Sequence, residues 1–255
     1  MVIVTPSEAQ RTSVPRGTQI DTFCPHNRVA NPHFSDVARP HLINQSDSIA
    51  EAASWIGPWN GSSTADVRSA THMPSQFTRP TPVRGNYAAM WLSNRGATEN
   101  MQYREGMMNR LARPIFRNSG IYTLTVEIAA MRPPSGPAPS FIGVYGVIRA
   151  PNGTLAAAPG SFTSPTNLNL YTSPEQVILL GTIEVPANAT ANWQGYSVQF
   201  DSATLPSHEW GVNHLLITKL DGASPATQIR YLAFDDFCLQ TLAEAGIAPP
   251  PANAQ

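Results

Sequence analysis

A two-residue alternation of apolar and polar side chains is the feature that most constrains the fold of this chain. The alternation is clearest over residues 121–129, where Thr123 and Thr125 occupy one face. The apolar positions share the other face and are Tyr122, Leu124, Val126 and Ile128. Because successive side chains of a strand point to opposite faces, this pattern predicts an antiparallel strand that is half buried.

The same period returns in shorter segments that are separated by loops rich in proline and glycine. The further predicted strands cover residues 28–34, 87–92, 141–148, 177–185, 193–200, 214–218 and 229–239. One two-turn helix is expected over residues 46–55, with Ser46 or Asp47 as its N-cap. About eight strands without clear helices between them predict an all-β protein, an antiparallel two-sheet sandwich.

Three glycines and two tryptophans are expected to shape these strands. Gly120 precedes the strand at 121–129 and is expected to have a positive φ, while Gly181 is expected to mark a bulge. Trp193 and Phe200 are seven residues apart, so a bulge near Gly195 is needed if both are to point inward. We expect Trp91 and Trp193 to belong to the core.

One ordered domain is expected between residues 23 and 242. Residues 1–22 are polar and without a period, and they predict an extended arm that docks the domain onto an assembly. Residues 243–255 are rich in alanine and proline and predict a flexible tail.

The charge of the chain excludes several classes of protein. Charged residues make up 13% of the 255 residues, about half the usual share, which disfavours coiled coils and long salt-bridged helices. The net charge is −1 and Lys219 is the only lysine, so we expect no nucleic-acid partner. No apolar run is long enough to span a membrane, and residues 1–10 do not resemble a signal peptide, so synthesis in a cytoplasm is expected.

The two cysteines leave two interpretations open. Neither Cys24 nor Cys238 belongs to a CxxC pair or to a spacing typical of zinc ligands. The ordinary interpretation is a pair of buried free thiols in a reducing compartment. The alternative is a disulfide that joins the two ends of one domain.

A series of short motifs resembles one family in its order and spacing. In chain order the motifs are Asn31-Pro-His-Phe34, Gly85-Asn-Tyr-Ala-Ala-Met-Trp91, Tyr103-Arg-Glu105, Ser119-Gly-Ile-Tyr-Thr-Leu-Thr-Val126, Trp193 with Val198-Gln-Phe200, His214-Leu-Leu-Ile217 and Phe234-Asp-Asp-Phe237. The succession resembles the galactose-binding-like jelly rolls that serve as carbohydrate-binding modules and as non-catalytic domains of bacterial surface and phage virion proteins. It covers about residues 28–240 and implies a jelly-roll sandwich; a fold alone does not settle function.

The resemblance also implies a covalent bond and a metal site. First and last strands are neighbours in such domains, which implies that Cys24 lies within reach of Cys238. Related modules often hold a structural calcium through acidic residues of these strands, and the matching residues here are Asp36, Asp235 and Asp236. Ser35 departs from the family pattern, which usually has a glutamate there, and the alternative is that the aspartates only accept hydrogen bonds or flank an exposed strand.

No catalytic motif appears in the sequence, so we expect a protein that is not an enzyme. Sugar binding needs aromatic faces with a few hydrogen-bonding side chains beside them. The residues that could supply these from loops are Trp55, Trp59, His72, Arg95 and Trp210.

These features favour a virion decoration or fibre protein of a phage or phage-like particle. The expected partners are other virion proteins, bound through the arm, and host surface glycans, and several copies are expected on one particle. A free-standing bacterial lectin is the alternative, and a glycan-active enzyme ranks below both. Apart from the calcium that the resemblance implies, no cofactor is expected.

Overall fold

The computed structural model describes residues 24–45, 48–58, 65–69, 75–92, 105–132, 139–149, 177–220 and 230–247. The expected arm at 1–22 and residues 248–255 of the expected tail lie outside these ranges. The first residues of that tail form a turn that closes the last strand, since the amide of Ala245 donates to the carbonyl of Thr241 (3.0 Å).

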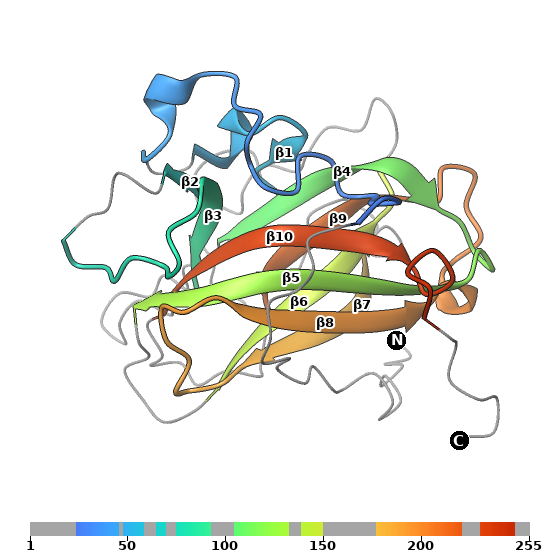
Figure 1. Ribbon diagram of the computed structural model, residues 1–255. Coiled ribbons are helices and arrows are strands. Elements are labelled where there is room, and N and C mark those ends of the chain that lie inside the picture. Colours follow the sequence, from blue (N-terminus) through green and yellow to red (C-terminus); the bar gives the residue numbers. More distant parts are fainter. Residues whose placement is uncertain are drawn as a thin grey trace, which may run out of the picture.

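The described chain is an all-β sandwich of two antiparallel five-stranded sheets. Its strands are β1 (Trp55–Ile56), β2 (Asp66–Ser69), β3 (Asn86–Trp91), β4 (Gly106–Ile115), β5 (Ile121–Arg132), β6 (Ser140–Val147), β7 (Val177–Val185), β8 (Gln194–Asp201), β9 (Val212–Lys219) and β10 (Tyr231–Thr241). One sheet has the order β1-β4-β9-β6-β7 and the other β2-β3-β10-β5-β8. Figure 1 shows β10, β5 and β8 lying across the other sheet, which is the jelly-roll sandwich that the resemblance implied.

Short 3₁₀ turns are the helical elements of the described residues. They are η2 (Pro40–Leu42), η3 (Ser48–Glu51) and η5 (Ser202–Thr204). The helix expected over residues 46–55 is therefore wrong. Ser54 has a left-handed backbone (φ 68°), and β1 begins at the next residue, so only a single turn fits before the chain extends.

The strands that alternate cleanly were predicted, and those that do not were missed. β5, β6, β7, β8, β9, β10 and β3 each lie on a predicted segment. Residues 28–34 do not form the expected strand, because Asn31 and Phe34 have positive φ values and only Val29 makes a bridge, to Leu111. β1, β2 and β4 were not expected.

The main core lies between the sheets and contains the predicted inward face of β5. Tyr122, Leu124, Val126 and Ile128 are all buried in it. Gly120 has the expected positive φ, of 123°. The bulge expected at Gly181 is also present, since the β6–β7 register shifts between Gly181 and Leu179.

A second aromatic cluster covers the outer face of the β2-β3-β10-β5-β8 sheet. Trp91 and Trp193, which were expected in the core, are partly buried and pack against this cluster rather than between the two sheets. β8 pairs with β5 without a register shift through Gly195, so the expected bulge there is wrong too and Trp193 and Phe200 face opposite sides. Residues 75–84 cross this face: the amide of Thr78 donates to Met131 O (2.7 Å), and Nε1 of Trp193 donates to Pro82 O (3.0 Å).

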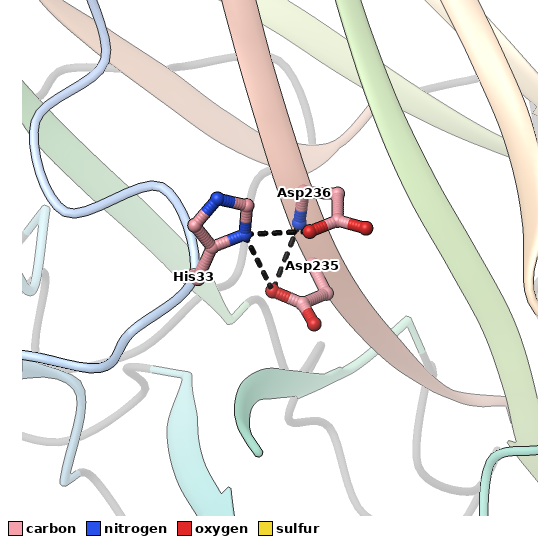
Figure 2. Close-up of side chains that lie close together, drawn as sticks. All are labelled: His33, Asp235 and Asp236. Atoms are coloured by element: carbon pink, nitrogen blue, oxygen red, sulfur yellow. Dashed lines mark hydrogen bonds and ion pairs between the residues drawn. The ribbon is translucent and has the colours of Figure 1, made fainter. Parts of the chain in front are cut away.

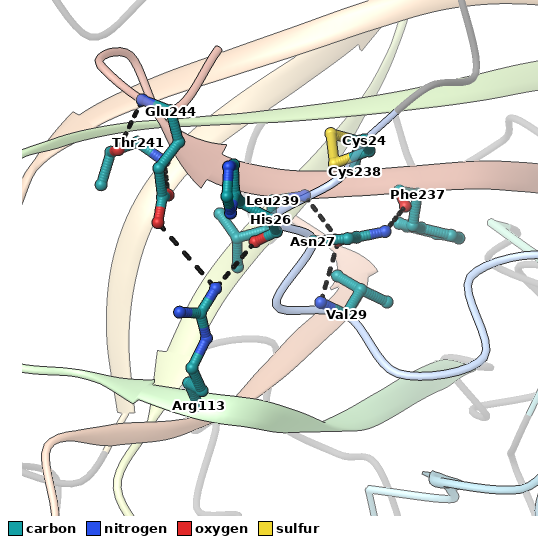
Figure 3. The surroundings of a disulfide bond; sticks show 10 residues. All are labelled: Cys24, His26, Asn27, Val29, Arg113, Phe237, Cys238, Leu239, Thr241 and Glu244. Carbon is teal, nitrogen blue, oxygen red and sulfur yellow. Dashed lines mark hydrogen bonds and ion pairs between the residues drawn. A yellow bond between two sulfur atoms is a disulfide. The ribbon is translucent and has the colours of Figure 1, made fainter.

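The first described residues are fastened to the last strand (Figure 3). Cys24 and Cys238 form a disulfide with a Cα–Cα distance of 5.9 Å, which selects the alternative that the resemblance implied over the two free thiols. The side-chain amide of Asn27 pairs with the backbone of β10 as a neighbouring strand would. Its Nδ2 donates to Phe237 O (2.6 Å), and its Oδ1 accepts from Leu239 N (2.9 Å). Arg28 then bonds to both sheets, donating from its amide to Leu239 and accepting from Ala112.

Candidate functional site

Two places in the fold bring together side chains that could bind a ligand or an ion. One is a cluster of charged residues, and the other is the loop that carries His208 and Trp210. The charged cluster joins the 31–36 loop to β10 through His33, Asp235 and Asp236 (Figure 2). Asp235 and Asp236 are consecutive yet both buried, because Asp236 has a φ of 54° and the β10–β5 register shifts between Asp235 and Cys238. The left-handed residue turns both carboxylates toward the same region.

Arg84 and Glu127 complete the charged cluster. Nδ1 of His33 lies 2.5 Å from an oxygen of Asp236 and 3.9 Å from one of Asp235. The guanidinium of Arg84 forms ion pairs with Asp236 and with Glu127 of β5. The cluster therefore ties together two loops and two neighbouring strands.

Burial and the neighbouring charges shift the pKa values of the residues in the charged cluster. Burial, followed by the charge of Asp236, raises the pKa of Asp235 to about 7. The hydrogen bond to Asp236 raises the pKa of His33. Burial opposes ionisation of Asp236, but its bond to His33 and the charge of Arg84 lower its pKa. Burial raises the pKa of Glu127, and its hydrogen bond and ion pair with Arg84 oppose that shift.

This cluster differs from the calcium site that the resemblance implied. In the described part of the chain, the group able to hold a metal ion is His33, Asp235 and Asp236, whose ligand atoms lie within 4.8 Å of one another. Asp36 is not in the group; it is exposed, and its backbone bonds to Asn31 and Ala53. Calcium prefers six to eight oxygen ligands, whereas here a histidine nitrogen and the guanidinium of Arg84 already occupy Asp236. The residues fit an ion-pair network better than they fit calcium.

Trp55 does not belong to a sugar-binding loop, which corrects its expected role. Its side chain is 1% exposed, and its ring packs 4.8 Å from Phe34 and 5.2 Å from Phe237, centroid to centroid. Its Nε1 donates to Asn31 O (3.0 Å), so both the face and the polar edge of the ring are used inside the protein. The expected roles of Trp59, His72 and Arg95 fall on residues outside the described ranges.

Trp210 lies where the sequence placed it, in the loop between η5 and β9. The ring is half buried and packs against the main core. His208 lies beside it, with ring centroids 4.9 Å apart and an interplanar angle of 51°. Two hydrogen bonds between residues close in sequence hold the loop. Trp210 N donates to Nδ1 of His208 (3.3 Å), and Gly211 N donates to His208 O (3.1 Å). Of the two candidate rings Trp55 and Trp210, Trp210 is therefore the one that is partly open to a ligand.

The sequence did not predict a role for His33, Arg84 or Glu127. His33 stands within a quoted motif, and its place after Asn31-Pro was the only local signal for a functional role. Arg84 and Glu127 reach the cluster from a loop and from the polar face of β5, and only the fold brings them together.

Comparisons with known protein sequences find no relative of this chain, whereas a comparison with solved structures finds distant structural similarities. A scan against models of protein families finds no match, and neither does a search of curated protein sequences. No helix among the described residues is long and apolar enough to cross a membrane.

Three solved structures illustrate what the chain is similar to. The enzymatically active domain of tailspike protein 4 from bacteriophage CBA120 superposes with a TM-score of 0.37 and 9% identity, over 84% of this chain and 21% of that one. A carbohydrate-binding module specific for non-crystalline cellulose, CBM28, gives 0.39 and 10%, over 78% of this chain and 97% of that module. The CBM22-1 and GH10 modules of the Clostridium thermocellum xylanase 10B give 0.40 and 9%, over 86% and 28%.

The chain thus spans about a fifth of the tailspike chain and somewhat over a quarter of the xylanase chain. With identities near 10% and TM-scores below 0.5, these similarities carry no argument about what the chain binds.

Proposed function

We propose that this chain is a non-enzymatic, carbohydrate-binding β-domain displayed on a phage or phage-like particle, where it aids adsorption to the host surface. The domain stacks a sugar ring on Trp210, and the arm at residues 1–22 docks it onto other virion proteins. Many copies on one particle supply the adhesion that a single weak site does not.

The observation that carries the sugar-binding part is the half-buried ring of Trp210. One side of the ring is fixed by the core, and the loop around it is closed by the contacts of His208. A ring held rigidly in a loop can stack on the apolar face of a pyranose, while neighbouring polar side chains bond to the hydroxyls. Glu209 is exposed and His208 is half exposed beside it, so such side chains are at hand.

The disulfide supports display outside a reducing cytosol. Bonds of this kind persist in oxidising surroundings and are rare where glutathione keeps thiols reduced. The bond joins Cys24 to β10, directly after the polar segment 1–22 that we propose as the docking arm. A mechanical force applied to the proposed arm would therefore be transmitted through the disulfide directly to β10, the central strand of its sheet.

The carboxylates near the charged cluster do not favour an enzyme. Glycoside hydrolysis needs two carboxyl groups that face each other across a sugar ring. In the described residues, Asp236 and Glu127 are instead bound to the same guanidinium, that of Arg84, inside the protein. These carboxylates therefore fit an ion-pair network better than they fit glycoside hydrolysis.

Two experiments test the two parts of the proposal. A variant that lacks residues 1–22 should no longer be incorporated into the particle, although its β-domain still folds. Normal incorporation of this variant into particles contradicts docking through the arm. A soluble monomer that never co-purifies with particles contradicts display and leaves the free-standing lectin.

The second experiment presents the domain on a glycan array, once as a monomer and once as a streptavidin tetramer. One aromatic–sugar stack stabilises a complex by about 1–2 kcal/mol, so the monomer should bind with a Kd near the millimolar range. The tetramer should give clear signals through multivalency. Absence of binding by the tetramer contradicts the sugar-binding part.

A further inference from the structure

Phe116 is an exposed aromatic side chain that nothing in the fold requires at the surface. Its side chain is 46% exposed, and it is the only aromatic residue among the large exposed hydrophobic residues of the described chain. It lies in the turn between β4 and β5, directly after Ile115, which is buried. A single exposed aromatic ring is common on protein surfaces, so its significance here depends on what lies beside it.

The ring of Phe116 lies against the residue that follows Trp210. Cδ1 of Phe116 is 3.0 Å from the position that a Cβ atom on Gly211 would occupy, and the carbonyl oxygen of Ile115 is 2.7 Å from it. Gly211 also has a φ of 57°, so both the space and the backbone require glycine. Ile115 pairs with Val212 across the β4–β9 ladder, which holds the two turns side by side.

Ser202 of η5 holds the turn that carries Phe116. Its hydroxyl accepts a hydrogen bond from Gly120 N (2.9 Å), and its carbonyl accepts one from Asn118 N (3.3 Å). Ser202 is itself fully buried. The pairing of Ile115 with Val212 therefore holds the turn that carries Phe116 beside the loop that carries Trp210. Aromatic residues on an ordered framework bind with little loss of conformational entropy.

We propose that Phe116 and Trp210 form a single two-ring platform for a neutral saccharide of at least two linked pyranose rings. The proposal rests on the proposed sugar-binding function and extends it. The ring of Phe116 lies against Gly211, the residue that follows Trp210, and in the proposed platform each ring contacts a different sugar of the ligand. A single sugar ring covers only one of them.

The size of the platform favours a saccharide over a protein. An aromatic side chain buries about 150–250 Å² when fully covered, so two such rings offer well under the roughly 800 Å² per partner of a stable protein interface. The exposed charges of the two turns are Arg117 and Glu209, one of each sign. They favour neither an anionic nor a cationic ligand, and they can donate to and accept from hydroxyl groups.

The experiment measures binding of glucose, galactose, cellobiose and lactose by saturation-transfer NMR titrations. The wild-type chain is compared with variants Phe116→Ala, Phe116→Tyr and Trp210→Ala, and with Val83→Ala as a control at another exposed apolar side chain (57% exposed). The thermal midpoint of each variant shows that it is folded. Because Phe116 and Val83 are exposed, their replacement should leave that midpoint unchanged.

The platform predicts that Phe116→Ala weakens disaccharide binding about fivefold and leaves monosaccharide binding almost unchanged. Phe116→Tyr and Val83→Ala should keep the wild-type affinity. If Phe116→Ala binds disaccharides as the wild type does while Trp210→Ala does not, the two-ring platform is wrong and the sugar-binding function stands. If no sugar binds the wild-type chain, both are contradicted.

Discussion

The disulfide should contribute a large share of the stability of this domain. Cys24 and Cys238 are separated by 214 positions, so the bond closes nearly the whole described chain into one loop. In the chain-entropy model, closing a loop of this length stabilises the folded state by about 5 kcal/mol, because the unfolded chain loses freedom. A domain of this kind has a total stability of about 5–15 kcal/mol, so the bond decides whether it stays folded under stress.

The assay is urea denaturation of the wild-type chain and of the Cys24→Ser/Cys238→Ser double variant. The variant should unfold at lower urea concentration, with a free energy of unfolding about 5 kcal/mol smaller and a steeper slope, since its unfolded state exposes more surface. Asn27→Ala is the matched control, because it removes the hydrogen bonds from Asn27 to Phe237 and Leu239 but keeps the covalent bond.

The control should lose about 1–3 kcal/mol, as expected for buried backbone groups that are left without partners. A difference below about 1 kcal/mol between the wild type and the double variant would refute the reasoning. It would mean that the bond does not form in the folded protein, or that the unfolded chain is already held together near its ends.

Two further predictions concern the core and the charged cluster. Leu124→Ala should lower the free energy of unfolding by about 2–5 kcal/mol, and Thr123→Ala by less than about 1 kcal/mol; equal losses in urea denaturation contradict the assigned faces of β5. Asp235 has a folded pKa of about 7, above its unfolded value of about 3.9, so its contribution to stability should be lost as the pH rises from 4 to 7. Denaturation at several pH values should show a smaller loss for Asp235→Asn than for the wild type. The contribution of His214 to stability changes with pH in the opposite direction, because burial lowers its pKa to about 4. His214 is present in both chains, so its contribution cancels when the two are compared. Equal pH dependence of the two chains contradicts the raised pKa of Asp235.

The fold could be predicted where side chains alternate between two different environments. β5 alternates apolar residues of the main core with Thr123, Thr125 and Glu127 on its other face, although Thr123 and Glu127 are themselves buried. β7 was predicted with its observed bounds. β4 was missed because Met107 and Met108 are both buried, one on each side of the sheet, while Arg113 and Pro114 near its end are exposed. A strand buried on both faces has no two-residue period to detect.

The aromatic and charged residues show where reasoning from local sequence fails. Trp55 stands before Gly57-Pro58 and was expected in a loop, but its neighbours in space are Phe34 and Phe237, far away in the sequence. Asp235 and Asp236 were expected on the last strand, facing Asp36; they lie on β10, but they contact the 31–36 loop through His33 rather than Asp36. The left-handed turn at Asp236 that brings this about has no sequence signal.

The most direct test of the central claim is the set of indole N–H resonances in a two-dimensional ¹⁵N–¹H NMR spectrum during titration with a disaccharide. The five tryptophans give five separate signals, and Trp210→Phe identifies that of Trp210. The indole N–H groups of Trp55 and Trp193 donate hydrogen bonds to the carbonyl oxygens of Asn31 and Pro82, and their signals serve as internal references. Sugar binding at the loop predicts that the Trp210 signal moves with added sugar while these two stay in place. A titration in which the Trp210 signal does not move, or in which only the signal of another tryptophan moves, contradicts the claim.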